Sequence, residues 1–194
     1  LKADFEEYDR VKLREKWGFS EKDEIISFVA RLQPEKRPLE LINIFKEVQL
    51  PNKKLLVVGD GPLKKEMQKK IQSFGLEDKA VIVPQVKYEE MWEIHYIADY
   101  FLNLRNDEIF GMAIMEAIYY KSCVIAVSAP GPDTILKNMD SHLICDSLSK
   151  IGNSLINKSK LNQDNISEDQ LRLKEQFRWS NCVETILSIN ETDM

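Results

Sequence analysis

The 194-residue sequence has little of several features that would assign it quickly to a class. It has no excess of basic residues, because 27 Lys and Arg stand against 32 Asp and Glu, a net charge of −5. This balance argues against a nucleic-acid-binding module, since such modules usually carry a basic surface. No apolar run approaches the roughly 20 residues of a membrane span, and the first residues do not resemble a signal peptide. What is left is the composition of an ordinary globular protein.

Cysteine and histidine are also scarce. There are three widely spaced cysteines and two histidines, and none of them has a neighbour at the spacing of a metal site. A structural zinc site and a disulfide framework are therefore not expected. Cys123, Cys145 and Cys182 fit small buried thiols in a reducing compartment. We expect a cytoplasmic protein, in contact with a membrane only at its periphery if at all.

Short apolar segments alternate with longer segments of helical period. Six segments are predicted as strands: Glu24–Ala30, Lys54–Val58, Ala80–Val83, Tyr100–Leu104, Cys123–Val127 and His142–Cys145. Five segments between them are predicted as helices: Arg37–Val48, Pro62–Ser73, Tyr88–Ala98, Gly111–Tyr120 and Asp133–Lys137. This alternation predicts an α/β fold, a Rossmann-like doubly wound parallel sheet of about six strands with helices on both faces.

The length favours a single domain over residues 1–194. Asn153–Asn165 is polar and predicts a surface connection, and Ser167–Gln170 resembles a capping box that opens a helical tail within 160–194. The first residue is Leu1 and not Met, so we expect a chain that was processed, renumbered or cut from a longer one.

Unusual residues follow the predicted strands at the edge where a doubly wound sheet binds its ligands. Cations, glycine turns and acids occur there: Arg31 and Lys36, Gly59-Asp60-Gly61, Asn106-Asp107-Glu108 and Ser128–Pro132. Arginine and lysine both bind phosphate oxygens, so this convergence predicts a site for an anionic ligand. On spacing alone, the two cations fit surface residues of a loop equally well.

The Gly59-Asp60-Gly61 turn invites comparison with a dinucleotide fingerprint. The third glycine of that pattern falls on Lys64, and the next strand ends in Pro84-Gln85 without an acid for a ribose. A tight turn between strand and helix is therefore favoured over a site for NAD.

The most informative segment is 109–120, where every residue except Glu116 is apolar, aromatic or glycine. Such a pattern predicts a helix buried on all sides, in which a carboxylate needs a partner. That partner is either a neighbouring protein group or the hydroxyls of a ligand, such as a ribose diol. Gly111 lets a phosphate approach the helix start, and Glu108 would lie in the loop above it.

The chain resembles the carboxyl-terminal half of retaining GT-B glycosyltransferases, in particular glycosyltransferase family 4. The resemblance runs in order from about Ile25 to Trp179. It is carried by Glu108-x7-Glu116 with Phe110-Gly111 between, Ala30-Arg31-Leu32-x-Pro34-Glu35-Lys36, the Val57–Pro62 turn, and Phe177 with Trp179. One departure is Leu104-Arg105, where the family commonly has Pro-Ser.

The resemblance implies a role for each matching residue. Arg31 and Lys36 would hold the donor diphosphate together with the amides of Gly111 and Met112. The other implied roles are the transferred sugar on Glu108, Ile109, Phe110 and Gly111, the ribose on Glu116, and the edge of the base on Gln85 and Val86. Glu108 would be the catalytic residue, and no metal or cofactor is implied.

The function implied by the resemblance is sugar transfer from a nucleoside diphosphate sugar, most often linked to UDP, to a glycan, a lipid or another acceptor. The amino-terminal domain that binds the acceptor is missing from this chain, so the chain alone is expected to bind nucleotide weakly and transfer nothing. Two alternatives stay open. One is a non-catalytic partner subunit that binds a nucleotide sugar, and the other is an NAD-dependent oxidoreductase of Rossmann type.

Overall fold

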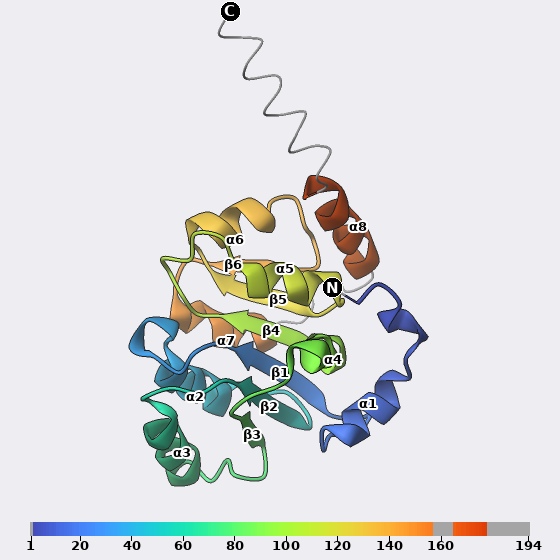
Figure 1. Ribbon diagram of the computed structural model, residues 1–194. Coiled ribbons are helices and arrows are strands. Elements are labelled where there is room, and N and C mark those ends of the chain that lie inside the picture. Colours follow the sequence, from blue (N-terminus) through green and yellow to red (C-terminus); the bar gives the residue numbers. More distant parts are fainter. Residues whose placement is uncertain (1, 157–164, 178–194) are drawn as a thin grey trace, which may run out of the picture.

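The computed structural model describes residues 2–156 and 165–177, and these residues form a parallel six-stranded sheet in the order β3-β2-β1-β4-β5-β6 (Figure 1). The strands are β1 (Glu24–Val29), β2 (Lys53–Val58), β3 (Ala80–Val83), β4 (Tyr100–Asn103), β5 (Cys123–Val127) and β6 (Leu143–Cys145). The strand order reverses between β1 and β4. That reversal is the position where doubly wound sheets open a crevice for ligands.

Helices connect the strands and cover both faces of the sheet. The α-helices are α1 (Arg10–Lys16), α2 (Pro38–Glu47), α3 (Lys64–Ser73), α4 (Met91–Ile97), α5 (Met112–Tyr119), α6 (Pro130–Ile135), α7 (Leu148–Ile156) and α8 (Ile166–Gln176). Short 3-10 turns cover Phe5–Glu7, Pro34–Lys36 and Tyr88–Glu90. Among the described residues, no helix is long and apolar enough to cross a membrane.

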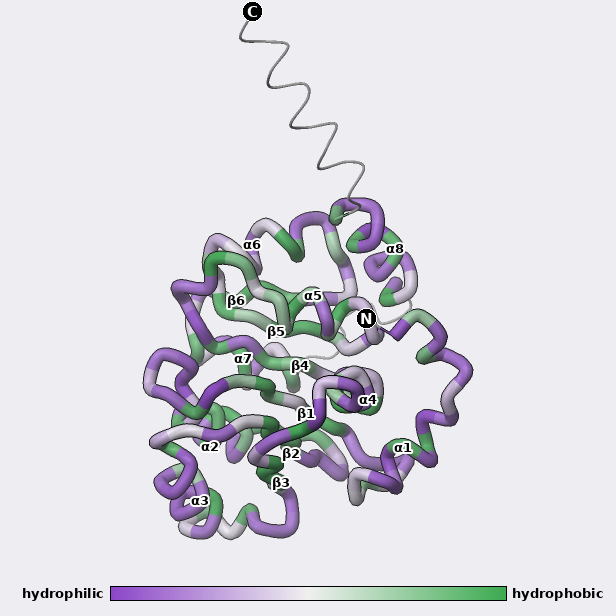
Figure 2. Tube along the Cα trace, in the orientation of Figure 1, coloured by the Kyte–Doolittle hydropathy of each residue, from purple (hydrophilic) through white to green (hydrophobic). Residues whose placement is uncertain are grey.

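The helices lie in two layers. Helices α2, α3 and α7 pack on one face of the sheet, while α1, α4, α5, α6 and α8 pack on the other (Figure 1). Hydrophobic residues gather along the strands and along α5, and hydrophilic residues line α3 and the outer loops (Figure 2). The candidate site lies on the same side of the sheet as α4 and α5.

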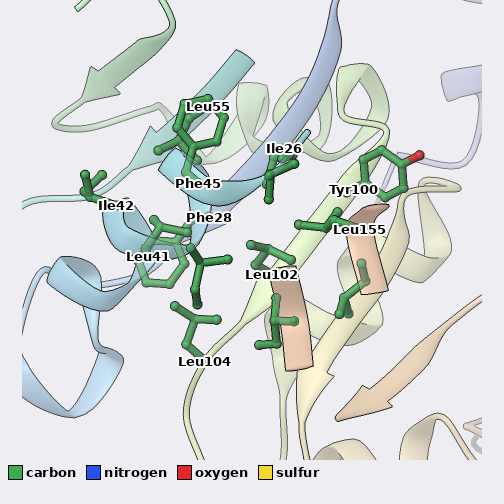
Figure 3. Packing of buried hydrophobic residues seen from close by; sticks show 14 of the residues in the cluster. Ile26, Phe28, Leu41, Ile42, Phe45, Leu55, Tyr100, Leu102, Leu104 and Leu155 are labelled. Carbon is green, nitrogen blue, oxygen red and sulfur yellow. The ribbon is translucent and has the colours of Figure 1, made fainter. Parts of the chain in front are cut away.

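The largest apolar cluster fills the space between the sheet and helices α2 and α7. Phe28 and Leu102 extend from neighbouring strands toward Leu41 and Phe45 of α2, and Leu155 packs from α7 (Figure 3). All of these side chains are buried. Burying each one stabilises the fold by about 1.5–3 kcal/mol, which gives the loops at the strand ends a rigid support.

All six predicted strands form, each with its ends within one residue of the prediction. The predicted helices also form, although the one expected over Asp133–Lys137 is found at Pro130–Ile135, where Pro130 occupies the first turn. Proline suits this position because its missing N–H would have no intrahelical acceptor there. The Rossmann-like fold expected from the sequence is therefore confirmed.

Two expectations about the carboxyl-terminal part are wrong. Residues 153–156 belong to α7 and not to a surface connection, because the buried Leu155 holds that turn on the core. The predicted capping box is not formed, since α8 begins at Ile166 with no side-chain cap. Its acidic residue Asp169 instead accepts a hydrogen bond from the Ser141 amide at 2.8 Å, which docks α8 on the sheet layer. Trp179, Cys182 and the rest of the predicted tail lie outside the described residues.

Helix α1 was not predicted from the sequence, because most of its residues are charged and no clear apolar period marks the segment. Its Arg14 is buried and donates hydrogen bonds to the Ile97 carbonyl at 2.9 Å and to the Asp99 carboxylate at 2.7 Å. This ion pair, more than an apolar face, fixes α1 beside α4.

Candidate functional site

Two loops at the carboxyl edge of the sheet are held together by backbone contacts. The Leu32 amide donates to the Asp60 carbonyl at 2.9 Å, and the Leu63 amide donates to the Leu32 carbonyl at 3.1 Å. A Cβ atom on Gly59 would lie 1.9 Å from the Ala30 carbonyl oxygen, so only glycine fits there. The Gly59-Asp60-Gly61 turn therefore has a structural reason, which is to support the loop that carries Arg31 and Lys36.

A cavity of about 260 Å³ opens where β1 and β4 end and α5 begins. We call it the Glu108 cavity. Its lining includes Lys36, Asn103, Arg105, Glu108, Phe110, Gly111 and Met112. It lies at the reversal of strand order, the position that the fold class predicts for a ligand.

The Glu108 carboxylate is held by two donors. The Lys36 ammonium lies 3.1 Å from Oε2, and the Gly111 amide donates to Oε1 at 3.3 Å. Burial raises the pKa of Glu108, but the hydrogen bond and charge of Lys36, the Gly111 amide and the charge of Arg105 outweigh it and lower the pKa below the ordinary value. The cavity therefore holds an ionised carboxylate directly over the start of a helix.

Two glycines shape the loop that carries Glu108. Gly111 is the N-cap of α5 with φ of +74°, a left-handed conformation that favours glycine. Gly131 donates its amide to the Glu108 carbonyl at 2.8 Å, and a Cβ on it would lie 2.9 Å from the Ile109 carbonyl carbon. The first turn of α6 thus holds the Glu108 loop in place, so the predicted edge segments 106–108 and 128–132 do converge.

Helix α5 is not buried on all sides, which corrects the expectation from its apolar sequence. Its inner face is buried, with Ile114 and Ile118 fully covered, but Met112 is 61% exposed at its start. Ile109 and Phe110, just before the helix, are also exposed, at 79% and 57%. These exposed apolar residues lie near the mouth of the Glu108 cavity. The hydrophobicity of the sequence alone does not distinguish them from residues of the core.

A second cavity, of about 210 Å³, lies between α4 and α5, and we call it the Glu116 cavity. It is lined by Lys2, Tyr88, Glu89, Met91, Trp92, His95, Glu116 and Tyr120. The Glu116 side chain is 29% exposed, and its Oε2 lies 3.6 Å from His95 Nε2. The sequence left open whether Glu116 meets a protein group or a ligand, and the structure provides both a basic neighbour and a cavity.

The two cavities both lie against one face of α5. Met112, Glu116 and Tyr120 are four residues apart and so share a face of the helix. Met112 lines the Glu108 cavity, whereas the other two line the Glu116 cavity. Four residues of helix rise by about 6 Å, so one extended ligand can reach from the helix start to Glu116.

The remaining predicted residues lie around these cavities. Arg31 is exposed and lines neither cavity, and its guanidinium makes no hydrogen bond or ion pair with the described residues, although its carbonyl accepts a hydrogen bond from the Gln33 amide at 2.9 Å. Gln85 is exposed and Val86 is half-buried in the loop that leads to Tyr88, which lines the Glu116 cavity. Their proposed contacts with phosphate and base stay predictions.

Sequence reasoning missed several lining residues. Arg105 lines the Glu108 cavity and pairs with the Asp107 carboxylate, and its only signal was the departure from Pro-Ser. His95 and Tyr88 line the Glu116 cavity but showed no motif. Within residues 2–156 and 165–177, no group of three or more His, Cys, Asp or Glu side chains is arranged to hold a metal ion.

The family model of glycosyl transferases group 1 matches residues 9–171. Among curated proteins, amylovoran biosynthesis glycosyltransferase AmsD of Erwinia amylovora is 31% identical over 168 residues, which are 86% of this chain and 45% of that protein. N-acetyl-alpha-D-glucosaminyl L-malate synthase of Bacillus anthracis is 25% identical over 139 residues, 71% of this chain and 36% of that protein. The chain thus spans less than half the length of these curated relatives.

Solved structures show the same fold at low sequence identity. Anabaena Alr3699/HepE in complex with UDP and glucose gives a TM-score of 0.79 at 19% identity, covering 94% of this chain and 52% of that one. The C-terminal domain of the glycosyl transferase group 1 family protein LpcC from Francisella tularensis gives 0.74 at 21% identity, covering 87% of this chain and 92% of that one. The chain therefore corresponds in extent to a domain that has been solved by itself in another protein.

Proposed function

Because the chain belongs to the glycosyl transferases group 1 family, we propose that it is the donor-binding half of an enzyme that transfers a sugar from a nucleoside diphosphate sugar. The observation that carries this proposal is the meeting of Lys36, Glu108 and the start of α5 in one cavity at the reversal of the sheet. The complex of the Anabaena structure with UDP and glucose supports a donor of this class.

The diphosphate of the donor would lie over the start of α5. The first-turn amides of Met112 and Ala113 have no intrahelical acceptor, and the helix dipole favours an anion there. Lys36 would add a positive charge beside the diphosphate. Its ammonium has three N–H donors, so it can bind Glu108 and a phosphate oxygen at the same time. The exposed Arg31 would turn toward the same phosphates.

The sugar would lie in the Glu108 cavity, in contact with the Glu108 carboxylate and with residues 109–111. Departure of the diphosphate breaks its bond to the anomeric carbon, and the acceptor hydroxyl attacks from the same face and gives its proton to the departing phosphate, so the anomeric configuration is retained. Stabilising the negative charge that develops on the leaving diphosphate would supply the largest share of the rate. The retaining course and the assignment to family 4 rest on the resemblance of the paired glutamates. The same resemblance implies no metal ion.

The nucleoside would extend along α5 toward the second cavity. Glu116 would accept hydrogen bonds from the ribose hydroxyls, and the loop of Gln85 and Val86 would border the base. UDP is the donor nucleotide we favour. The acceptor, a glycan or a lipid, would bind to an amino-terminal domain that completes the active site.

A panel of UDP, GDP, ADP and NAD tests the ligand class by thermal unfolding of the 194-residue chain. A nucleotide that binds the folded state stabilises it according to its concentration over its dissociation constant, so millimolar ligands remain detectable. We expect UDP to raise the melting temperature most. A preference for NAD would support an oxidoreductase and contradict the proposal.

Two variants separate the roles of the glutamates. Glu116→Ala is expected to weaken UDP binding, whereas Glu108→Ala is expected to lower turnover of the complete enzyme more than it lowers UDP affinity. If both variants bind and turn over like the parent, the assignment of roles is wrong. If the complete enzyme with both glutamates binds UDP but shows no transfer, a non-catalytic partner subunit is the better explanation.

A further inference from the structure

His95 is the only described residue of the Glu116 cavity whose side chain is wholly inaccessible to solvent. Two aromatic rings lie close to its imidazole. The ring of Tyr120 is nearly parallel to it, with ring centres 6.3 Å apart and an interplanar angle of 12°, and the ring of Phe101 is tilted, with ring centres 5.5 Å apart. The imidazole is therefore buried among aromatic side chains, where its ring nitrogens need hydrogen-bond partners.

Both ring nitrogens of His95 lack a hydrogen-bond partner among the described residues. Buried polar atoms are nearly always paired, since an unpaired one costs about 1–3 kcal/mol. Glu116 Oε2 lies 3.6 Å from His95 Nε2, just beyond hydrogen-bond range. A small movement of the carboxylate would therefore bring the two atoms within hydrogen-bond distance.

The Glu116 carboxylate itself is also without a hydrogen bond in the described part of the chain. The lysine that lines the cavity is engaged elsewhere, because the Lys2 ammonium lies 4.7 Å from the Tyr8 ring centre and 3.5 Å from the Asp4 carboxylate. The Tyr120 hydroxyl accepts the Lys2 amide at 2.7 Å. Among described groups, His95 is thus the basic side chain placed to orient Glu116.

We propose that His95 is a positioning residue that hydrogen-bonds one oxygen of Glu116 and aims the carboxylate at the ribose hydroxyls of the donor. This inference rests on the proposed function, because it requires Glu116 to meet a ribose. Binding of the ribose would draw Glu116 toward the imidazole edge and pair atoms that are unpaired in the free protein. The free energy gained there would add to nucleotide affinity only when the hydroxyls are present.

The test compares two ligands on variants of the 194-residue chain by calorimetry. The ligands are the diphosphate that stabilises the fold most in the panel, expected to be UDP, and its 2′,3′-dideoxy form, which lacks the hydroxyls. His95→Phe is expected to weaken UDP binding about tenfold, the effect of one hydrogen bond to a charged group, and dideoxy-UDP binding less than twofold. A purely structural role would weaken both ligands equally, and that result would overturn the inference.

Conservative variants guard against a loss of folding. His95→Gln places an amide near the position of Nε2 and is expected to recover most of the UDP affinity, whereas His95→Asn, whose amide lies near Nδ1, is not. The matched control is His142→Phe, which removes the other buried histidine, one that lines neither cavity. It is expected to leave the ratio of the two affinities unchanged.

The outcomes separate this inference from the proposed function. If the parent chain discriminates between the two ligands and Glu116→Ala abolishes the discrimination while His95→Phe does not, only the role of His95 is refuted. If the parent chain binds none of UDP, GDP and ADP, the proposed function falls and the inference falls with it.

Discussion

The two cavities along α5 differ in how completely their carboxylates are satisfied. In the Glu108 cavity the carboxylate already has an ammonium at 3.1 Å and a backbone amide at 3.3 Å. In the Glu116 cavity, His95 Nε2 lies 3.6 Å from the carboxylate, just beyond hydrogen-bond range, and both ring nitrogens of that histidine lack a hydrogen-bond partner among the described residues. The chain itself therefore fixes the Glu108 carboxylate, whereas it does not fix the Glu116 carboxylate by a hydrogen bond from a described residue.

This difference matches the two kinds of interaction that the proposed reaction needs. Charge that develops during reaction is stabilised best by groups that are already fixed, because they need no reorganisation. A group that recognises the ground-state ligand can instead gain its partners on binding, and then it contributes to affinity and to discrimination. On the proposed function, the Glu108 cavity would contribute mainly to rate, and the Glu116 cavity mainly to affinity for the nucleotide through its ribose.

The largest effect is expected from Phe5, which packs against Tyr120, one of the residues that line the Glu116 cavity. Phe5 is fully buried, and its ring centre lies 5.1 Å from the ring centres of both Tyr96 and Tyr120. Phe5→Ala is expected to lower the free energy of unfolding by about 3–5 kcal/mol, measured by chemical denaturation. The matched control is Phe110→Ala in the Glu108 cavity, where the ring is 57% exposed and a change below about 0.5 kcal/mol is expected. Equal losses in the two variants would contradict the difference in packing between the buried Phe5 beside the Glu116 cavity and the exposed Phe110 of the Glu108 cavity.

The next effect concerns Lys36 and is one of rate. Lys36→Met is expected to lower turnover of the complete enzyme about 100-fold, because it removes a fixed positive charge beside the leaving diphosphate. It also removes the donor that lowers the pKa of Glu108, so the acid limb of the pH–rate profile is expected to move to higher pH. Lys64→Met is the control, since Lys64 pairs at 3.0 Å with Asp60 on the exposed turn. Turnover of Lys36→Met within threefold of the parent would contradict the role.

The framework around both cavities follows from sequence patterns that depend on burial alone. The strands that end at the site have long apolar runs, such as Leu55–Val58, that fit a sheet buried on both faces. The predictions were wrong for segments whose position depends on a polar contact. Helix α1 is held by the buried Arg14, and α8 is docked by Asp169 in place of the expected capping box. No periodicity in sequence records which distant carbonyl or amide a polar side chain will reach.

The candidate site was also only partly predictable from the sequence. Lys36, Glu108 and Gly111 were found because they follow strands in the chain, and strand ends meet at one edge of a parallel sheet. His95 was missed because it lies one turn inside an apolar helix, where a histidine looks like part of the core. Its significance comes from Glu116, which is 21 residues away in the chain, and only the packing of α4 on α5 brings the two together.

The buried His142, which lines neither the Glu108 cavity nor the Glu116 cavity, provides a contrast with His95. Burial lowers the pKa of His142 from its ordinary value of 6.5 to about 4, and the charge of Asp169 opposes this only in part. The unfolded chain therefore binds a proton that the folded chain does not. Stability is complete above pH 6.5 and falls as the pH decreases toward 4, by up to about 3 kcal/mol from this group.

Chemical denaturation between pH 7 and pH 4 measures this slope. His142 Nδ1 accepts the Val124 amide at 2.9 Å, so His142→Asn keeps an acceptor without a titrating ring. The variant is expected to show a flatter dependence on pH than the parent. An unchanged slope would mean that carboxylates alone cause the loss at low pH.

The smallest effect is expected from two glycine variants. Their comparison separates the local geometry at the start of α5 from the backbone strain that any alanine at a positive φ introduces. Gly111 has φ of +74°, and a Cβ on it would lie 3.1 Å from Ile114 Cδ1 and 3.2 Å from Ile135 Cδ1. Gly75 has φ of +62° with nothing within 4 Å of a Cβ, so Gly75→Ala introduces similar strain without crowding. Each alanine is expected to cost about 1 kcal/mol of unfolding free energy. Only Gly111→Ala displaces the amide that faces Glu108 and the first turn of α5, so it alone is expected to weaken binding of inorganic pyrophosphate, measured by calorimetry. If both variants bind pyrophosphate like the parent, the anion does not lie at the start of α5, and the division of labour between the two cavities has to be abandoned.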